Sequence, residues 1–183
     1  MNNVLGTGAL SLGFVAAIAA TGWWILGVRH AKLRPRARRL TVAMAVSAAI
    51  ACGVLVYALV THDFSVRYVA ENGGRAVPLY YTVISLWAAL EGSLLLWLLV
   101  LSGYAVLVMR HVHPRAAVLH PWAMAVICGV AVFFFGLALF AGNAFQPVSP
   151  VPADGPGPNP LLQDHPLMGV HPPLLYLGYV GLT

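Results

Sequence analysis

The stretch LTVAMAVSAAIACGVLVYALVT, residues 40–61, contains no charged side chain and is long enough to cross a lipid bilayer as one helix. A membrane-spanning helix needs about 20 predominantly apolar residues. Three further stretches meet the same requirement, at about residues 4–28, 83–109 and 121–142. A closed β-barrel would instead show short segments of alternating hydrophobicity, and these stretches do not alternate. The sequence therefore predicts an all-α fold, a polytopic transmembrane helical bundle with four full spans.

The composition supports a membrane protein. Of the 183 residues, 60% are hydrophobic and only 8% are charged, and the mean hydropathy is +0.83. A soluble domain carries about 25% charged residues. The first stretch has no basic segment ahead of it and is too long for the apolar part of a signal peptide, so we interpret it as a permanent span. Cys52 and Cys128 fall inside predicted spans and form no CxxC pair, so we expect them to be packing residues.

The net charge of +5 is concentrated between the spans, which argues against nucleic acid as a partner. Cytoplasmic loops carry an excess of Lys and Arg. This rule places the first and third loops in the cytoplasm, next to anionic lipid of the bilayer. The N-terminus, residues 62–82 and residues 143–172 then lie on the outer side. The basic residues of the two cytoplasmic loops are Arg29, Lys32, Arg34, Arg36, Arg38, Arg39, Arg110 and Arg115.

Segment 143–172 is rich in Pro and Gly, which disfavours regular helix through most of it. Such a composition is also typical of a flexible linker. The apolar residues interspersed in it favour a packed outer loop on the membrane surface: Phe145, Leu161, Leu162, Leu167 and Met168. A fifth span begins near residue 173 and is too short to cross, which indicates that the chain is part of something longer.

His171 is the main candidate site residue, in HPPLLYLGY, residues 171–179. Pro172 restricts His171 to an extended backbone, and Pro173 suits the first turn of the following helix. These restraints predict an imidazole at the outer mouth of a helix, where the dipole favours the neutral ring that a ligand of iron or another metal must offer. A helix-capping surface histidine is the alternative. His165 also precedes a proline and could face the same site, although a surface histidine at a local turn explains it more simply.

Glu91, in SLWAALEGSLLLW at residues 85–97, is the one carboxylate inside a predicted span. An ionisable group within the membrane is costly unless it has a partner, so it is a functional candidate by default. Helical spacing would place Trp87 one turn away on the same face. A carboxylate hydrogen-bonded to a neighbouring helix, with a purely structural role, explains Glu91 equally well.

Several motifs occur together in one order: YVAENGGRAVPLYYTVISLW (68–87), EGSLLLW (91–97), PADG (152–155), NPLLQD (159–164) and HPPLLYLGYVG (171–181). This ordered set closely resembles the N-terminal part of the CcmF/NrfE family, the haem lyase subunits of bacterial cytochrome c maturation. The residues do not separate CcmF from NrfE. Two departures stand out: many relatives carry His at the position of Leu90, and DGPGPNP lacks an arginine that often follows its first glycine.

The resemblance implies a multi-pass protein of the bacterial cytoplasmic (inner) membrane. It implies that haem b arrives on CcmE and is attached to the CxxCH thiols of apocytochrome c on the outer face, with help from CcmH and CcmI. His171 would be a haem axial ligand that Pro172 and Pro173 hold in place. The family's tryptophan-rich haem segment and second outer histidine would lie beyond Thr183, so this chain alone would not be a complete lyase.

Two other possibilities remain open. A naturally split gene would supply the haem-binding half as another chain. The other possibility is that the chain belongs to a different class of protein, a non-catalytic helical subunit of a respiratory or transport complex, with Glu91 in a proton or quinone path.

Overall fold

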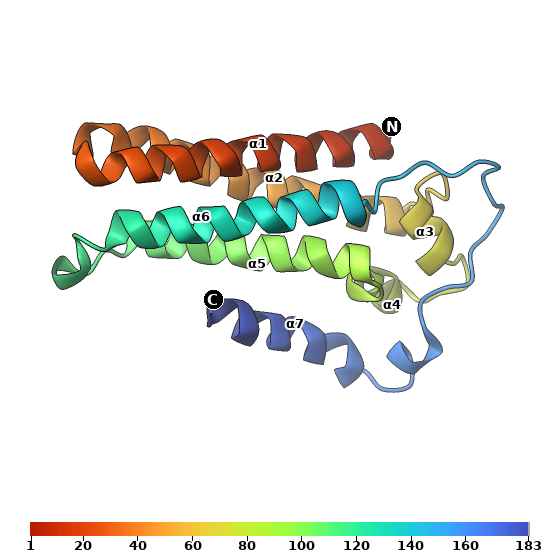
Figure 1. The fold of residues 1–183 in the computed structure, drawn as a ribbon. Coiled ribbons are helices and arrows are strands. Elements are labelled where there is room, and N and C mark those ends of the chain that lie inside the picture. The colour runs from red at the N-terminus through yellow and green to blue at the C-terminus, as the bar shows by residue number, and fades with distance from the viewer. Residues whose placement is uncertain (183) are drawn as a thin grey trace.

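The computed structural model of the chain describes residues 1–182 (Figure 1). The α-helices of this part are α1 (Asn2–Arg29), α2 (Arg34–Val60), α3 (Arg67–Asn72), α4 (Leu79–Ile84), α5 (Leu90–Arg110), α6 (His120–Gly136) and α7 (Leu167–Gly181). Four helical segments are long and apolar enough to cross a membrane: Asn2–Arg29, Ala31–Val60, Leu90–Arg110 and His120–Ala141. These findings confirm the predicted all-α polytopic bundle with four spans.

The four long helices pack side by side as an antiparallel bundle (Figure 1). Helix α1 contacts α2 and α6, and α5 contacts the same two helices from the other side. Helix α7 lies outside this bundle along α5. We call the two ends of the bundle the arginine end (residues 29–39 and 110–120) and the loop end (residues 61–89 and 142–166). The N-terminus lies at the loop end (Figure 1).

Small residues allow the long helices to approach closely, as is common between membrane helices. The Phe135 ring of α6 lies against Gly13, and the Phe145 ring lies against Gly6, so that a β-carbon at either glycine would overlap the ring. The buried face of α1 consists mostly of small residues: Gly6, Ala9, Gly13, Ala16, Ala17 and Ala20.

Both cysteines are buried and free. The Cys52 thiol donates to the Leu95 carbonyl at 3.3 Å, and the Cys128 sulfur lies 3.8 Å from the Thr41 hydroxyl. The two thiols therefore pack inside the bundle, as the sequence predicts.

The third predicted span is wrong in its first part. The structure divides residues 79–110 into α4, a 3-10 turn (Ser85–Trp87) and α5, which begins only at Leu90. Ala89 has an extended backbone, with φ −136 and ψ 172. The Tyr68 hydroxyl donates to the carbonyls of Ser85 and Leu86 and accepts the Ala89 amide. A tyrosine from another segment thus satisfies the backbone groups that a continuous helix would have paired internally.

The Pro/Gly-rich loop is packed against the segment that follows α2 rather than free. Arg67 donates its backbone amide to the Gln146 carbonyl at 2.8 Å, and Gly157 donates to the Gly73 carbonyl at 2.8 Å. Asp154 accepts the Arg75 amide at 2.9 Å. These bonds join segments that lie about 80 residues apart in the chain, and they favour the packed loop over the flexible linker.

Candidate functional site

Helix α7 carries His171, and it begins earlier than the sequence predicts. The prediction placed His171 in an extended segment, with a helix starting near residue 173. The helix in fact starts at Leu167, so that His171 lies in its second turn, with Pro172 and Pro173 inside the helix. That part of the prediction is wrong, and so is the end of the predicted loop at residue 172. The helix dipole no longer explains a neutral ring, because its effect falls off within the first turn.

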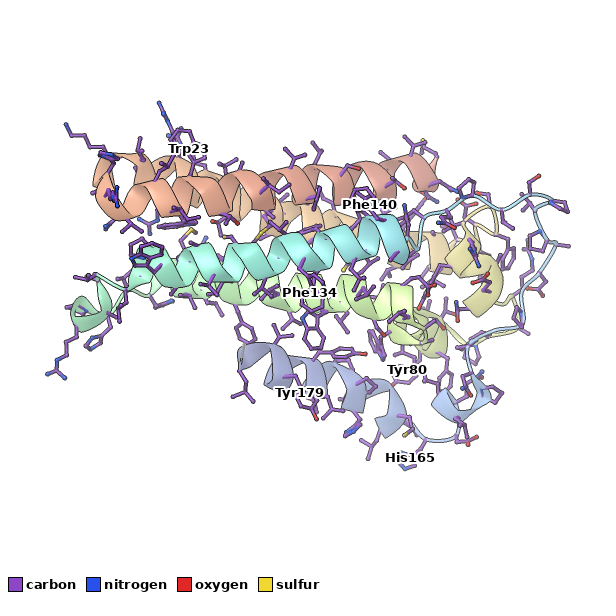
Figure 2. The ribbon with its side chains drawn as sticks, viewed as in Figure 1. Trp23, Tyr80, Phe134, Phe140, His165 and Tyr179 are labelled. Carbon is purple, nitrogen blue, oxygen red and sulfur yellow. The ribbon has the colours of Figure 1, made fainter. Side chains whose placement is uncertain are left out.

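His165 explains the early start of α7. Its Nδ1 atom accepts the Leu167 amide at 3.2 Å, and its carbonyl accepts the Met168 amide at 2.9 Å. The first amides of a helix have no partner within the helix, so this histidine, which precedes the N-cap Pro166, stabilises the start of α7 by pairing with one of them. The side chain is exposed at the turn before the helix (Figure 2). Its position matches the surface histidine at a local turn.

The Tyr80 hydroxyl is a second restraint on the start of α7, because it donates to the Pro166 carbonyl at 2.9 Å. Gly169 then faces α4 so closely that its missing β-carbon would lie 2.7 Å from the Tyr80 hydroxyl and 2.9 Å from Ile84. Tyr80 lies between α4 and α7 in Figure 2. Helix α7 is therefore fixed on α4 at its first turn.

The His171 imidazole points away from the bundle. Gly169 faces α4, and Tyr176 faces α5, where its hydroxyl bonds the Ser93 hydroxyl at 3.1 Å and its ring contacts Trp97. A residue turns by about 100° along a helix, which puts His171 on the opposite side. The ring is exposed and has no hydrogen-bond partner among residues 1–182, so neither of its nitrogens is engaged there.

Apolar side chains surround His171 on this exposed face. Residues three and four positions away are neighbours on a helix surface. At His171 these neighbours are Leu167, Met168, Leu174 and Leu175, which are 66%, 44%, 60% and 40% exposed. A haem face can use a single free imidazole on an apolar surface, because haem iron accepts an imidazole nitrogen as axial ligand and the macrocycle is flat and apolar.

An apolar groove of about 610 Å³ lies beside this face, between α4 and α7. Its size falls within the usual range for small-molecule sites, about 300–1,000 Å³. Pro173 and Leu174 line it from α7, and Trp87 lines it from the turn before α5. The Trp87 indole Nε1 is buried without a hydrogen-bond partner in the described part of the chain. The sequence gives no signal for this groove, because it forms only when α7 docks on α4.

Glu91 lies in a different place, in the first turn of α5, at the loop end of the span Leu90–Arg110. It lines a small polar cavity of about 40 Å³ together with Arg67, Tyr68 and Glu71. The expected neighbour Trp87 belongs to the preceding turn, so the predicted shared helix face is wrong. A carboxylate in the first turn of a helix is favourable because free amides point toward it. The cavity and the groove share no lining residue.

Charged groups at the loop end are held by hydrogen bonds. Burial raises the pKa of Asp63, but bonds from Ser65 and Asn2 outweigh it and bring this pKa below its usual value. Backbone amides of Arg75 and Gly155 lower the pKa of Asp154. Both carboxylates therefore remain charged and anchor the surrounding turns. Within residues 1–182, no three His, Cys, Asp or Glu side chains are grouped to hold a metal ion.

Comparisons with known proteins agree on one family. Residues 87–183 match the model of the family described as Cytochrome C assembly protein. The chain is 38% identical to the cytochrome c-type biogenesis protein CcmF of Escherichia coli over 177 residues, and 36% identical to that of Haemophilus influenzae over 178 residues. These matches cover 95% and 96% of the chain and 27% of each relative. The probable biogenesis protein NrfE of Escherichia coli is 37% identical over 133 residues, which is 73% of the chain and 24% of that relative.

A solved structure named cytochrome c heme lyase CcmF matches the whole chain with a TM-score of 0.83 and 35% sequence identity, over 28% of that protein. The chain thus spans about a quarter of the length of its relatives. The matched family region contains His171, both following prolines and the α7 side of the groove, whereas the α4 side of the groove precedes it. With this fold and these motifs, the chain belongs to the cytochrome C assembly protein family, in its CcmF/NrfE branch.

Proposed function

We propose that the chain is part of a cytochrome c haem lyase of a bacterial cytoplasmic membrane, with its loop end on the outer side. The arginine end carries eight of the ten Lys and Arg residues. Since cytoplasmic loops are enriched in such residues, this end faces the cytoplasm. The loop end, with the N-terminus and residues 142–166, then faces outward together with the start of α7.

His171 acts in this proposal as an axial ligand of haem iron. The observation that carries it is the free imidazole among four exposed apolar side chains of α7. Pro172 and Pro173 fix the φ angles that follow His171, so the ring stands on a stiff segment. Pro173 also forms part of the adjacent groove wall. The other iron ligands would come from the remaining three quarters of the full-length protein.

Haem b is the substrate in this reaction. The CxxCH thiols of apocytochrome c add across its vinyl groups, and the protein's contribution is to bind and orient the two reactants. The relatives are cytochrome c-type biogenesis proteins, which makes CcmE the expected haem donor. CcmH and CcmI are the expected partners that present the apocytochrome. This chain would hold the haem face and would not complete the reaction alone.

A proton path remains a second role for Glu91, whereas a quinone site is disfavoured there. The cavity beside Glu91 has a volume of about 40 Å³, which admits water but is far below the roughly 300–1,000 Å³ of small-molecule sites. A quinone ring is several times larger. The neighbouring Arg67 and Glu71 make the cavity polar, which suits water rather than an apolar ring.

The function is tested with His171→Gly in the full-length protein, expressed with its partners. We expect cytochrome c maturation to fall at least tenfold at an unchanged protein level, and added imidazole to restore much of it by occupying the vacated space. His165→Asn is the matched control, because it replaces an exposed histidine on the same segment while keeping a side-chain acceptor for the Leu167 amide. Normal maturation in His171→Gly without imidazole would refute the ligand role.

A further inference from the structure

The arginine end carries positive charge without a local counter-charge. The described chain has no carboxylate at this end. All five lie at or next to the loop end: Asp63, Glu71, Glu91, Asp154 and Asp164. No carboxylate of the described chain therefore balances the basic residues of this end.

Some of these basic side chains are already engaged within the chain. The engaged pairs are Arg34 with the Gly27 carbonyl at 2.9 Å, Arg38 with the Met109 carbonyl at 3.2 Å, and Arg36 over the Trp23 ring at 5.0 Å. Trp23 lies near the arginine end of the molecule (Figure 2). Arg29, by contrast, has no side-chain partner among residues 1–182.

Arg29 lines a cleft of about 300 Å³ between the end of α1 and the start of α6. Ile25, Leu26 and Trp122 form its apolar wall, and each is about half exposed. Arg29 and His30 form its polar rim. The cleft thus combines a cation with an apolar wall that continues along the lipid-facing side of α1.

The length of α1 places this rim among lipid headgroups. The helix has 28 residues, which is about 42 Å at 1.5 Å per residue. The hydrocarbon layer is about 30 Å thick, so roughly one turn at each end lies outside it. Arg29 ends the helix at headgroup level, whereas Ile25 and Leu26 lie one turn deeper, where acyl chains begin. Trp122 suits the same interface.

We propose that this cleft binds one anionic phospholipid. Its phosphodiester would pair with Arg29 and His30, and the upper part of an acyl chain would lie along Ile25, Leu26 and Trp122. Basic pockets between membrane helices are a known means of binding anionic headgroups. Inorganic phosphate would leave the apolar wall bare, and a zwitterionic lipid would bring its own cation next to unbalanced arginines. An anionic lipid satisfies both parts of the cleft.

The test is native mass spectrometry of the full-length protein in a mild detergent, titrated with dioleoyl phosphatidylglycerol or dioleoyl phosphatidylcholine. We expect one tightly bound phosphatidylglycerol molecule and weaker binding of phosphatidylcholine. Arg29→Gln should weaken phosphatidylglycerol binding about fivefold, as expected for one arginine near an anionic lipid, and should leave phosphatidylcholine binding unchanged. Inorganic phosphate should not displace the bound lipid.

Arg39→Gln is the matched control. Arg39 is exposed at the same end, lies outside the cleft and has no side-chain partner within residues 1–182. It should leave the tight site intact. Equal losses in Arg29→Gln and Arg39→Gln would overturn the proposal in favour of a diffuse basic rim. Equal affinity for the two lipids, or displacement by phosphate, would also overturn it.

Discussion

At the scale of single residues, two histidines of similar sequence context have different surroundings. His165 and His171 both precede a proline. His165 accepts a backbone amide at the start of α7, whereas His171 stands free one turn and a half later among exposed apolar side chains. The first has a structural task within the chain, and the second is available for a ligand.

Glu91 has a local explanation as a first-turn carboxylate of α5, and it makes no hydrogen bond within residues 1–182. We therefore expect Glu91→Gln to lower the free energy of unfolding by less than about 1 kcal/mol, the size of a helix-dipole interaction. Assembly and maturation should persist, as measured by protein level and holocytochrome yield. Loss of maturation in a fully assembled protein would show instead that the charge itself takes part in the function.

His62 has a positive φ of 54° at the end of α2. The amides of His62 and Asp63 bond the carbonyls of Leu59 and Ala58, the pattern of a Schellman cap, where glycine is usual. His62→Gly should therefore be more stable than His62→Ala by about 1 kcal/mol, the cost of a β-carbon in this conformation. Thermal melting of the two variants in detergent checks this order, and a reversed order would contradict the backbone explanation.

Asp63 ties the N-terminus of α1 to the turn after α2 through Asn2 and Ser65. Its pKa is below the usual value, so its stabilisation is complete above the unfolded pKa of about 3.9 and is lost as pH falls through the folded value. Hydrogen exchange at the loop end should accelerate below about pH 4 relative to pH 5, beyond the intrinsic change. The extra acceleration should shrink in Asp63→Ala, and an unchanged profile in that variant would contradict this assignment.

At the scale of elements, the break between α4 and α5 depends on Tyr68. This side chain is 2% exposed, and burial raises the pKa of its hydroxyl, which stays protonated and donates to two carbonyls. Tyr68→Phe would leave the Leu86 carbonyl and the Ala89 amide unpaired, at a cost of about 1–3 kcal/mol. The melting temperature should fall, whereas Tyr57→Phe, on the exposed face of α2, should leave it unchanged. Equal changes in the melting temperature of the two variants would show that Tyr68 does not stabilise the break.

The same break shows where sequence patterns stop being informative. Uninterrupted hydrophobicity predicted a span from residue 83, because nothing between Val83 and Leu90 marks a helix end. The end is imposed by Tyr68, which comes from α3. The early start of α7 has a similar origin, since His165 and Tyr80 outweigh the preference of Pro172 for an extended residue before it. In both places a tyrosine that is remote in sequence, Tyr68 or Tyr80, bonds the backbone where the helix begins.

At the scale of the whole molecule, the four spans and the concentration of arginines at one end were predictable from composition and length alone. The sequence also singled out His171, whose ligand role stays a prediction, although for a reason that the structure replaces. The prediction placed it at a helix mouth, and the structure places it on the exposed apolar face of α7. The groove between α4 and α7 could not be predicted, because it depends on how Gly169 docks against Tyr80 and Ile84.

This arrangement leaves α7 with two different sides. One side is docked on α5 through the bonds Tyr176 to Ser93 and Tyr104 to the Leu177 carbonyl. The other side presents His171, and Tyr179 also points away from the bundle (Figure 2). The relatives are about four times as long as this chain, and in the proposed lyase the free side of α7 is the one that haem and further segments would reach.

The most direct test of the haem-ligand role is the absorption spectrum of haem bound to the full-length protein with His171→Cys. A thiolate in place of an imidazole changes the electronic environment of the iron. We therefore expect the Soret band of the variant to shift to that of a thiolate-ligated haem, at an unchanged protein level. A spectrum and haem content identical to those of the unaltered protein would contradict the account and show that His171 does not touch the iron.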